Sequence, residues 1–273
     1  MVRPEKDGKI LRTTTHSLKE MKSARKKIAV LTSYDHPTAT ILDESGIDIV
    51  LVGDSVGNVI LGYENTIPVT MDEMLHHTKA VTRAVSNAMV IVDMPFMSYQ
   101  LNPEQALSNA SRFIKEGGAN GVKIEGDIYI DSIKKIIEAG IPVMGHLGFT
   151  PQLVNQIGGY RVQGRSADEA KAIIEGAKDL EKAGVFCLVL EMVPALLARR
   201  ISETLSIPVI GIGAGPHCDG QVLVINDILG FSVNGMPKFA KKYTDLHAEI
   251  KKAVANYISD VRGGRFPGSE HSF

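Results

Sequence analysis

Short runs of apolar residues, many of them β-branched, alternate along the chain with longer stretches in which apolar residues recur every three or four positions. The short runs predict strands and the longer stretches predict amphipathic helices. The short runs are apolar at nearly every position, which is typical of parallel strands buried on both faces. The predicted strands end near residues 32, 54, 93, 125, 146, 191, 212 and 225.

Several predicted helices carry recognisable start signals. Thr70 with Glu73, and Ser166 with Glu169, have the spacing of a capping box, in which two side chains bind each other's backbone N–H groups. Asn102 before a proline predicts a third helix start. The predicted helices cover residues 36–44, 70–86, 102–117, 128–139, 166–184, 194–205 and 243–261.

The joints between helices and strands resemble one another. Gly46, Gly140 and Gly184 each follow a predicted helix and directly precede a strand, and glycine tolerates the left-handed conformation that ends a helix. About eight such units in roughly 250 residues predict an α/β fold, a (β/α)8 TIM barrel. An open doubly wound sheet is the main alternative. Because no linker interrupts the pattern, we expect one domain over residues 1–273, with a short N-terminal extension and a C-terminal helix and tail.

Four acidic residues stand at the ends of predicted strands: Asp54, Asp93, Glu125 and Glu191. A carboxylate at the end of a buried strand costs free energy unless it has a partner. In a (β/α)8 barrel the carboxyl ends of all strands meet at one mouth, so we expect one shared site. His146 ends the fifth strand, and Lys123 lies two residues before Glu125 and therefore on the same face of its strand.

The predicted site offers oxygen ligands and a base. Asp54, Asp93 and Glu125 suit Mg²⁺ or a similar hard cation. Magnesium leaves positions for substrate oxygens, such as those of a 2-oxo acid, and a metal on the keto oxygen acidifies the adjacent C–H bond. Glu191 is the candidate general base. Lys123 is a candidate for neutralising developing negative charge or holding the substrate carboxylate.

Structural explanations for single residues stay open at this point. Asp54 could cap a loop, Glu125 could be an exposed loop residue, and His146 could be a hydrogen-bonded core histidine. Lys123 is harder to explain in this way, because lysine is almost never fully buried without a partner.

Composition excludes several classes of protein. The net charge is -1 over 273 residues, so the chain lacks the excess positive charge that binding to nucleic acid or to an anionic membrane requires. Cys187 and Cys218 are far apart and form no disulfide or zinc motif. No stretch approaches the ~18 apolar residues of a membrane span, and the N-terminus has no apolar signal core. We therefore expect a cytoplasmic protein.

Ten segments follow one another in the order of a known family: residues 31–35, 52–57, 93–97, 122–126, 145–148 with 150–152, 158–164, 190–194, 211–215, 237–241 and 267–273. On these segments the chain resembles the ketopantoate hydroxymethyltransferases over nearly its whole length. Only the first ~20 residues match no motif of that family. The resemblance implies a TIM barrel of the phosphoenolpyruvate/pyruvate type.

The resemblance also implies an activity. Family members transfer a hydroxymethyl group from 5,10-methylenetetrahydrofolate to 3-methyl-2-oxobutanoate through a Mg²⁺-stabilised enolate. The products are 2-dehydropantoate (ketopantoate) and tetrahydrofolate, and the reaction belongs to pantothenate biosynthesis. The resemblance further implies one Mg²⁺ per subunit. It also implies a homo-oligomer, specifically a decamer.

The family pattern assigns roles to residues of this sequence. The magnesium ligands are expected to be Asp54, Asp93 and Glu125. The oxo acid is expected to contact Asp54, Ser55, Asp93 and Lys123, with His146 near the new hydroxymethyl group. Glu191 is the expected proton acceptor. The folate-binding residues are not readable, although Tyr160 and Arg161 lie in a long segment that is a candidate lid.

Two other functions stay open. A Mg²⁺-dependent lyase or mutase of the same barrel superfamily would share the site. Many such lyases use a cysteine in a mobile loop, whereas Cys187 lies in a predicted strand and Cys218 follows a glycine-rich run. The other alternative is a non-catalytic barrel that binds an oxo acid without turnover.

Overall fold

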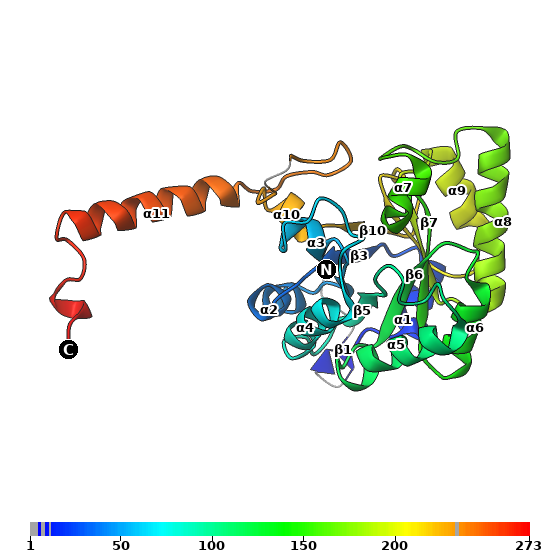
Figure 1. The fold of residues 1–273 in the computed structure, drawn as a ribbon, viewed down its shortest axis with the longest axis horizontal. Helices are drawn as coiled ribbons and strands as arrows, with labels where there is room; N and C mark the ends of the chain where they lie inside the picture. The colour runs from blue at the N-terminus through cyan, green and yellow to red at the C-terminus, as the bar shows by residue number, and fades with distance from the viewer. Residues whose placement is uncertain (1–4, 7–8, 11, 233–234) are drawn as a thin grey trace. The chain divides into compact units, whose positions relative to one another are not determined.

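The computed structural model describes residues 5–6, 9–10, 12–232 and 235–273, and the chain divides into two compact units between Val224 and Ile225. In the described part of the first unit, eight parallel strands close into a barrel in the order β10-β3-β4-β5-β6-β7-β8-β9 (Figure 1). This confirms the predicted (β/α)8 barrel and excludes an open sheet. The strands are β3 (Ile28–Thr32), β4 (Ile49–Val52), β5 (Met89–Asp93), β6 (Gly121–Glu125), β7 (Val143–Gly148), β8 (Cys187–Glu191), β9 (Val209–Ile212) and β10 (Gly220–Leu223).

Most of the strands are buried on both faces, as their composition predicts, whereas β3 and β10 each have one exposed residue. Every residue of β4, β5 and β6 is buried. Met89 and Ile91 belong to the apolar cluster inside the barrel, and Asp93 follows at the next position on the same face of β5. The same alternation that fills the barrel with apolar side chains therefore delivers polar side chains at its carboxyl end.

Six longer helices alternate with the strands and surround the barrel (Figure 1). They are α2 (His36–Glu44), α4 (Met71–Thr82), α5 (Pro103–Lys115), α6 (Ile130–Glu138), α8 (Ala167–Ala183) and α9 (Ala195–Thr204). Both predicted capping boxes are confirmed: in α4 the Glu73 N–H donates to the Thr70 hydroxyl, and the Glu73 carboxylate accepts from the Thr70 N–H. The Ser166 box starts α8 in the same way, and Asn102 caps α5.

Some predicted boundaries are wrong by a few residues. β4 ends at Val52, and Asp54 lies in the turn that leads into the short helix α3 (Val56–Val59) rather than in the strand. The prediction also extends the helix after Thr70 to residue 86, whereas α4 ends at Thr82. Residues 86–88 are instead held by Asp43 of α2, whose buried carboxylate accepts their backbone N–H bonds.

Two other strand ends differ from the prediction. β7 continues to Gly148, where Phe149 donates a backbone hydrogen bond to the carbonyl of Glu191. β10 ends at Leu223, because Ile225 already begins the one-turn helix α10 (Ile225–Ile228).

A helix that the sequence pattern did not predict, α1 (Thr15–Ser23), closes the amino-terminal end of the barrel. Its Leu18 is fully buried in the apolar cluster inside the barrel. Lys22 forms an ion pair of 2.7 Å with Asp219, which precedes β10, and Thr13 donates to the carbonyl of Asn87, which precedes β5. The segment before β3 therefore plugs the end opposite the strand-end acids. The predicted N-terminal extension also includes β1 (Glu5–Lys6) and β2 (Lys9–Ile10), and lies partly outside the described residues.

The second unit contains α10, α11 (Leu246–Arg262) and the single turn η2 (Ser269–His271). Within it, the Tyr257 ring packs against Phe266, and Arg265 pairs with Asp260. The helix and tail predicted after the last strand are thus present, and the single domain remains a prediction. No helix in the described part of the chain combines the length and apolar character that crossing a bilayer requires.

Candidate active site

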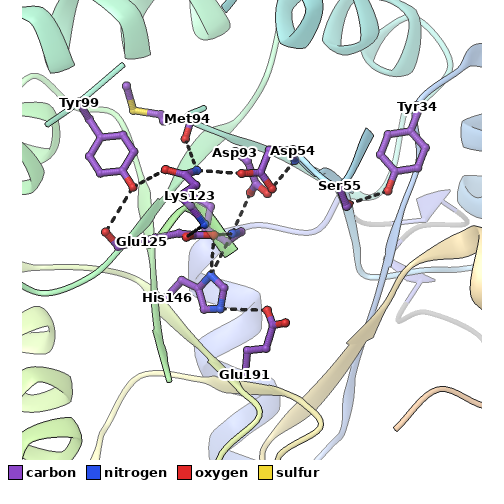
Figure 2. A network of polar contacts seen from close by, with 11 residues as sticks. Tyr34, Asp54, Ser55, Asp93, Met94, Tyr99, Lys123, Glu125, His146 and Glu191 are labelled. Atoms are coloured by element: carbon purple, nitrogen blue, oxygen red, sulfur yellow. Dashed lines mark hydrogen bonds and ion pairs between the residues drawn. The ribbon is translucent and has the colours of Figure 1, made fainter. Parts of the chain in front are cut away.

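The register of the barrel strands brings the predicted polar residues together. Asp93 at the end of β5 pairs with Lys123 of β6, and Glu125 of β6 pairs with His146 of β7. Glu191 ends β8 beside Gly148 of β7. Four neighbouring parallel strands therefore supply five side chains at one mouth, as their positions in the sequence predict (Figure 2).

Lys123 lies at the centre of this group. Its Nζ atom is 3.2 Å from Asp93 Oδ1, 3.9 Å from Glu125 Oε1 and 3.2 Å from His146 Nδ1. Lys123 is only 5% exposed, so these partners must replace the water that would otherwise stabilise the charge of its ammonium group. Burial disfavours the charged form, but the neighbouring carboxylates of Asp93 and Glu125 outweigh it and raise the pKa of Lys123. Lys123 is therefore a fixed positive charge in the site.

His146 connects the buried acids to Glu191. Its Nδ1 atom lies 3.3 Å from Glu125 Oε1, and its Nε2 atom lies 3.3 Å from Glu191 Oε2 (Figure 2). Burial and the nearby Lys123 charge lower the pKa of His146 and favour the neutral ring. Since the Lys123 ammonium can only donate, Nδ1 of that neutral ring accepts, which leaves the proton on Nε2 facing Glu191. His146 is therefore part of the site rather than a core histidine.

Asp54 reaches the site from the turn after β4. Its backbone N–H donates to Asp93 Oδ2 over 3.1 Å. A side chain at Gly53 would place its Cβ atom 2.7 Å from Ser55 Oγ, so it would displace the Ser55 hydroxyl from its present position. Ser55 lies beside it, with its hydroxyl 2.8 Å from that of the buried Tyr34. The turn thus presents an acid and a hydroxyl at the mouth.

Gln152 is a site residue to which the sequence analysis gave no role. Its side-chain N–H donates to Asp54 Oδ2 over 2.8 Å, and its backbone N–H donates to Glu125 Oε2 over 3.0 Å. Its Oε1 accepts from the Tyr99 hydroxyl over 2.8 Å. Gln152 lies in the short turn η1 (Pro151–Leu153) after β7, inside one of the ten family-like segments. Membership of that segment was the only sequence feature that could have marked Gln152 as a site residue. The local pattern of apolar and polar residues does not predict that a glutamine in a loop contacts the site.

The site holds more negative than positive charge. Burial, followed by the charges of Asp93 and Glu125, raises the pKa of Asp54 well above its ordinary value. Burial raises the pKa of Glu125 to about 7. Burial also raises the pKa of Glu191, against the lowering effect of the hydrogen bond with His146. Four carboxyl groups share one ammonium group here, so either protons or a cation must balance the excess charge.

These acids fit a magnesium ion. Within the described residues, Asp93 Oδ1 and Glu125 Oε1 are buried and accept no hydrogen bond of good geometry, although the Lys123 ammonium lies 3.2 Å and 3.9 Å from them. Each oxygen therefore keeps a lone pair for a cation. In the described part of the chain, no three or more acidic, histidine or cysteine side chains are placed so that together they could hold a metal ion. Magnesium does not need such a group, because it is commonly held by one or two carboxylates together with water and substrate oxygens.

Comparison with solved structures shows the class of barrel. The fold is similar to phosphonopyruvate hydrolase crystallised with oxalate and Mg²⁺, with a TM-score of 0.62 and 9% identity over 94% of this chain and 92% of that chain. It is also similar to 2,3-dimethylmalate lyase, a member of the PEP mutase/isocitrate lyase superfamily, with a TM-score of 0.59 and 14% identity over 96% and 92% of the two chains. At these identities the likeness shows a shared fold, a closed (β/α)8 barrel like the one described above.

Sequence comparison shows the family. Residues 12–269 match the family model of ketopantoate hydroxymethyltransferase. The chain is 56% identical to the 3-methyl-2-oxobutanoate hydroxymethyltransferase of Dehalococcoides mccartyi, over 96% of this chain and 94% of the relative. It is 53% identical to that of Syntrophomonas wolfei, over 96% and 95%. The chain belongs to the ketopantoate hydroxymethyltransferase family, as the ten segments predict.

Proposed function

We propose that this protein transfers a hydroxymethyl group from 5,10-methylenetetrahydrofolate to 3-methyl-2-oxobutanoate, forming 2-dehydropantoate and tetrahydrofolate in pantothenate biosynthesis. Family membership supports the reaction. The structural observation that carries it is the position of Glu191, whose carboxylate lies 3.3 Å from His146 at the mouth that holds Asp54, Asp93 and Glu125. A carboxyl group in this place can take a proton from a carbon beside a keto group.

Glu191 is the proton acceptor in this proposal. It removes the proton from C3 of the oxo acid, and burial raises its pKa, which makes it a stronger base than an exposed glutamate. His146 Nε2 lies 3.3 Å from Glu191 Oε2, and His146 lowers the pKa of that carboxyl group against the effect of burial. C3 then bonds to the methylene carbon of the folate as one of the two C–N bonds of that carbon breaks. Water displaces the second nitrogen and supplies the hydroxyl group, and the two nitrogens take up the proton from C3 and one proton from the water as tetrahydrofolate leaves.

The remaining residues bind and orient the oxo acid. Lys123 places a buried positive charge where the carboxylate or the developing negative charge of the substrate lies. Ser55 offers a hydroxyl group whose direction is set by Tyr34. One Mg²⁺ per subunit would be held by Asp54, Asp93 and Glu125, and when bound it supplies Lewis-acid polarisation of the keto oxygen.

Deuterium exchange at C3 of 3-methyl-2-oxobutanoate tests this proposal without folate. We expect the wild type to exchange C3 in the presence of Mg²⁺. Glu191→Gln should abolish exchange while it still binds the oxo acid. Asp93→Asn should weaken the dependence on Mg²⁺. A wild type that does not exchange would remove the proton-abstraction role, and unchanged metal dependence in Asp93→Asn would remove the ligand assignment.

The thiols argue against a lyase that uses a catalytic cysteine. Cys187 and Cys218 are both fully buried, and burial raises the pKa of the Cys218 thiol to about 11. Burial raises the pKa of Cys187 as well. Neither thiol is therefore suited to act as an acid or a nucleophile at neutral pH. The decameric homo-oligomer remains a proposal that rests on the family resemblance, and the cytoplasmic location remains a proposal that rests on the sequence pattern.

A further inference from the structure

A cavity of about 440 Å³ lies beside the proposed base. It is lined by Tyr160, Arg161, Val162, Arg165, Glu169 and Met192. Met192 directly follows Glu191 in the chain, so one residue of the cavity wall is the neighbour of the proposed base. None of the residues assigned above to the oxo acid or to the metal lines this cavity. It is therefore a separate space next to the reacting atoms.

The segment that forms the cavity is fixed to the end of β8. The backbone N–H of Gln163 donates to the carbonyl of Met192 over 2.9 Å. A Cβ atom at Gly164, whose φ is +79°, would lie 2.5 Å from a side-chain methyl of Leu197 on α9, so the segment packs closely against that helix. Met192 itself has a φ of 48°, a strained value for a residue that is not glycine. The cavity wall is thus held in one conformation beside the site.

Tyr160 places an aromatic ring between the cavity and the site. Its ring packs against that of the buried Phe149, with 4.8 Å between the centroids, and 63% of the residue stays exposed. Burial and the charges of Glu191 and Asp54 raise the pKa of Tyr160, so its hydroxyl lies within the field of the catalytic acids. One face of the ring is therefore supported by protein, and the rest is free to contact a ligand.

The cavity is positively charged. Within the described residues, no ion pair is formed by the guanidinium group of Arg161 or of Arg165. Glu169 is the acid nearest to them in the cavity wall, but its carboxylate accepts the backbone N–H groups of Arg165 and Ser166 at the start of α8. These backbone bonds are the main cause of its lowered pKa. The Arg161 charge contributes more weakly to that lowering, so Glu169 offsets part of the positive charge without pairing directly with either arginine.

We propose that this cavity binds the p-aminobenzoylglutamate part of the folate co-substrate, with Tyr160 against the benzoyl ring and Arg161 and Arg165 on the glutamate carboxylates. The inference rests on the proposed function and names the residues that hold its second substrate. A guanidinium group matches a carboxylate with two parallel hydrogen bonds, and a tyrosine ring offers a flat apolar surface to another ring.

The order of chemical groups in the folate fits an orientation in which the glutamate lies in the cavity and the methylene carbon points toward Glu191. The reactive methylene carbon and the glutamate carboxylates lie on opposite sides of the benzoyl ring. Carboxylates held by Arg161 and Arg165 therefore leave the methylene carbon directed toward Glu191. A longer polyglutamate tail adds carboxylates on the side away from the site, next to the same arginines. The geometry thus also predicts tighter binding of polyglutamates.

Equilibrium binding of tetrahydrofolate, measured by calorimetry with the Mg²⁺-loaded full chain, tests the proposal. Replacing both arginines (Arg161→Gln with Arg165→Gln) should weaken binding of the monoglutamate by about tenfold or more, since two charge-assisted contacts are lost. The gain in affinity from mono- to triglutamate should shrink in the same variant. Tyr160→Leu should weaken both forms equally. Arg200→Gln, an exposed arginine of α9 outside the cavity, is the matched control and should bind both forms like the wild type.

Competition identifies the group that the arginines recognise. Free p-aminobenzoylglutamate should displace tetrahydrofolate from the wild type, and inorganic phosphate at the same concentration should not. Displacement by phosphate alone, unchanged folate affinity in the double variant and in Tyr160→Leu, or an equal loss in Arg200→Gln would each overturn the inference. A wild type that binds tetrahydrofolate but does not exchange C3 would reject the proposed function instead. Binding of 3-methyl-2-oxobutanoate by each variant reports whether it is folded.

Discussion

Gln152 Nε2 donates a hydrogen bond to Asp54 Oδ2 over 2.8 Å, and this contact joins the loop after β7 to the turn after β4. The same residue donates its backbone N–H to Glu125, and the Tyr99 hydroxyl donates to its side-chain oxygen. Because that oxygen accepts from Tyr99, the amide must direct its N–H group toward Asp54. One loop residue therefore sets the orientation of two of the three expected magnesium ligands.

Gln152→Leu should weaken Mg²⁺ binding or activity by about 10- to 100-fold, because partners that orient metal ligands typically have effects of this size. Leucine keeps the bulk of the side chain but cannot donate to Asp54. The measurements are the Mg²⁺ dissociation constant and kcat/KM for the oxo acid. Gln152→Glu is a useful second variant, since it adds a like charge beside Asp54 and should be worse than leucine. Unchanged metal affinity in both variants would show that Gln152 has no orienting role.

His146→Leu should move the acid limb of the C3 exchange profile to higher pH. Glu191 must be deprotonated to act as a base, and His146, 3.3 Å away, lowers its pKa against the effect of burial. Without the imidazole the pKa of Glu191 rises further, so exchange is lost at a higher pH as the solution is made more acidic. The profile of exchange rate against pH measures this shift. His146→Gln retains an N–H donor and should show a smaller shift. If the acid limb of the exchange profile lay at the same pH in His146→Leu and His146→Gln, the prediction would be wrong.

The metal-free protein should become less stable as the pH rises from about 4.5 through 7. Burial raises the pKa of Glu125 from its ordinary value of 4.5 to about 7. Between these values the folded state binds more protons than the unfolded chain, so the free energy of unfolding decreases with pH. The raised pKa values of Asp54 and Glu191 act in the same direction.

Thermal unfolding with EDTA and with Mg²⁺, at pH 5.5 and pH 8, measures this dependence. Added Mg²⁺ should raise Tm more at pH 8, where it replaces no protons, than at pH 5.5, where protons compete with it. Glu125→Gln should flatten the pH dependence of the EDTA-treated protein. An EDTA-treated wild type that is more stable at pH 8 than at pH 5.5 would show that the acids are not held together as described.

The sequence predicts much of this site because of the two-residue period of a strand. In β5 the inward positions read Met89, Ile91 and Asp93, so the last member of an apolar row is the acid that faces the mouth. The same holds for Glu191, at the end of the row formed by Cys187 and Val189. The parallel direction of the strands then places the row ends together. Local pattern and fold class were therefore sufficient for these acids.

Other parts of the structure were not predictable from local pattern. Gln152 belongs to a loop, and its place depends on Asp54, which is 98 residues away in the chain. Asp54 itself lies beyond the end of β4, where its backbone N–H donates to Asp93, which is 39 residues away in the chain. The sequence of α1 lacks a regular repeat of apolar residues, and its Leu18 is buried because it packs into the end of the barrel. Contacts between distant segments decide each of these cases.

Leu18→Ala should destabilise the protein by about 2–5 kcal/mol, the range for removing a fully buried leucine side chain. Leu18 packs into the barrel from α1 and belongs to a cluster with Ile28, Ile49 and Met89, so its loss leaves a cavity that rigid strands cannot easily fill. Urea unfolding of the full chain measures this change.

Leu101→Ala is the matched control for Leu18, because Leu101 is 65% exposed and its truncation should change stability by no more than about 0.5 kcal/mol. C3 exchange by Leu18→Ala, measured well below its Tm, should stay close to that of the wild type, since α1 closes the end of the barrel opposite Glu191 and His146. A stability loss no larger than that of Leu101→Ala would show that α1 does not plug the barrel. A selective loss of exchange in the folded variant would instead show that the plug supports the site through the core.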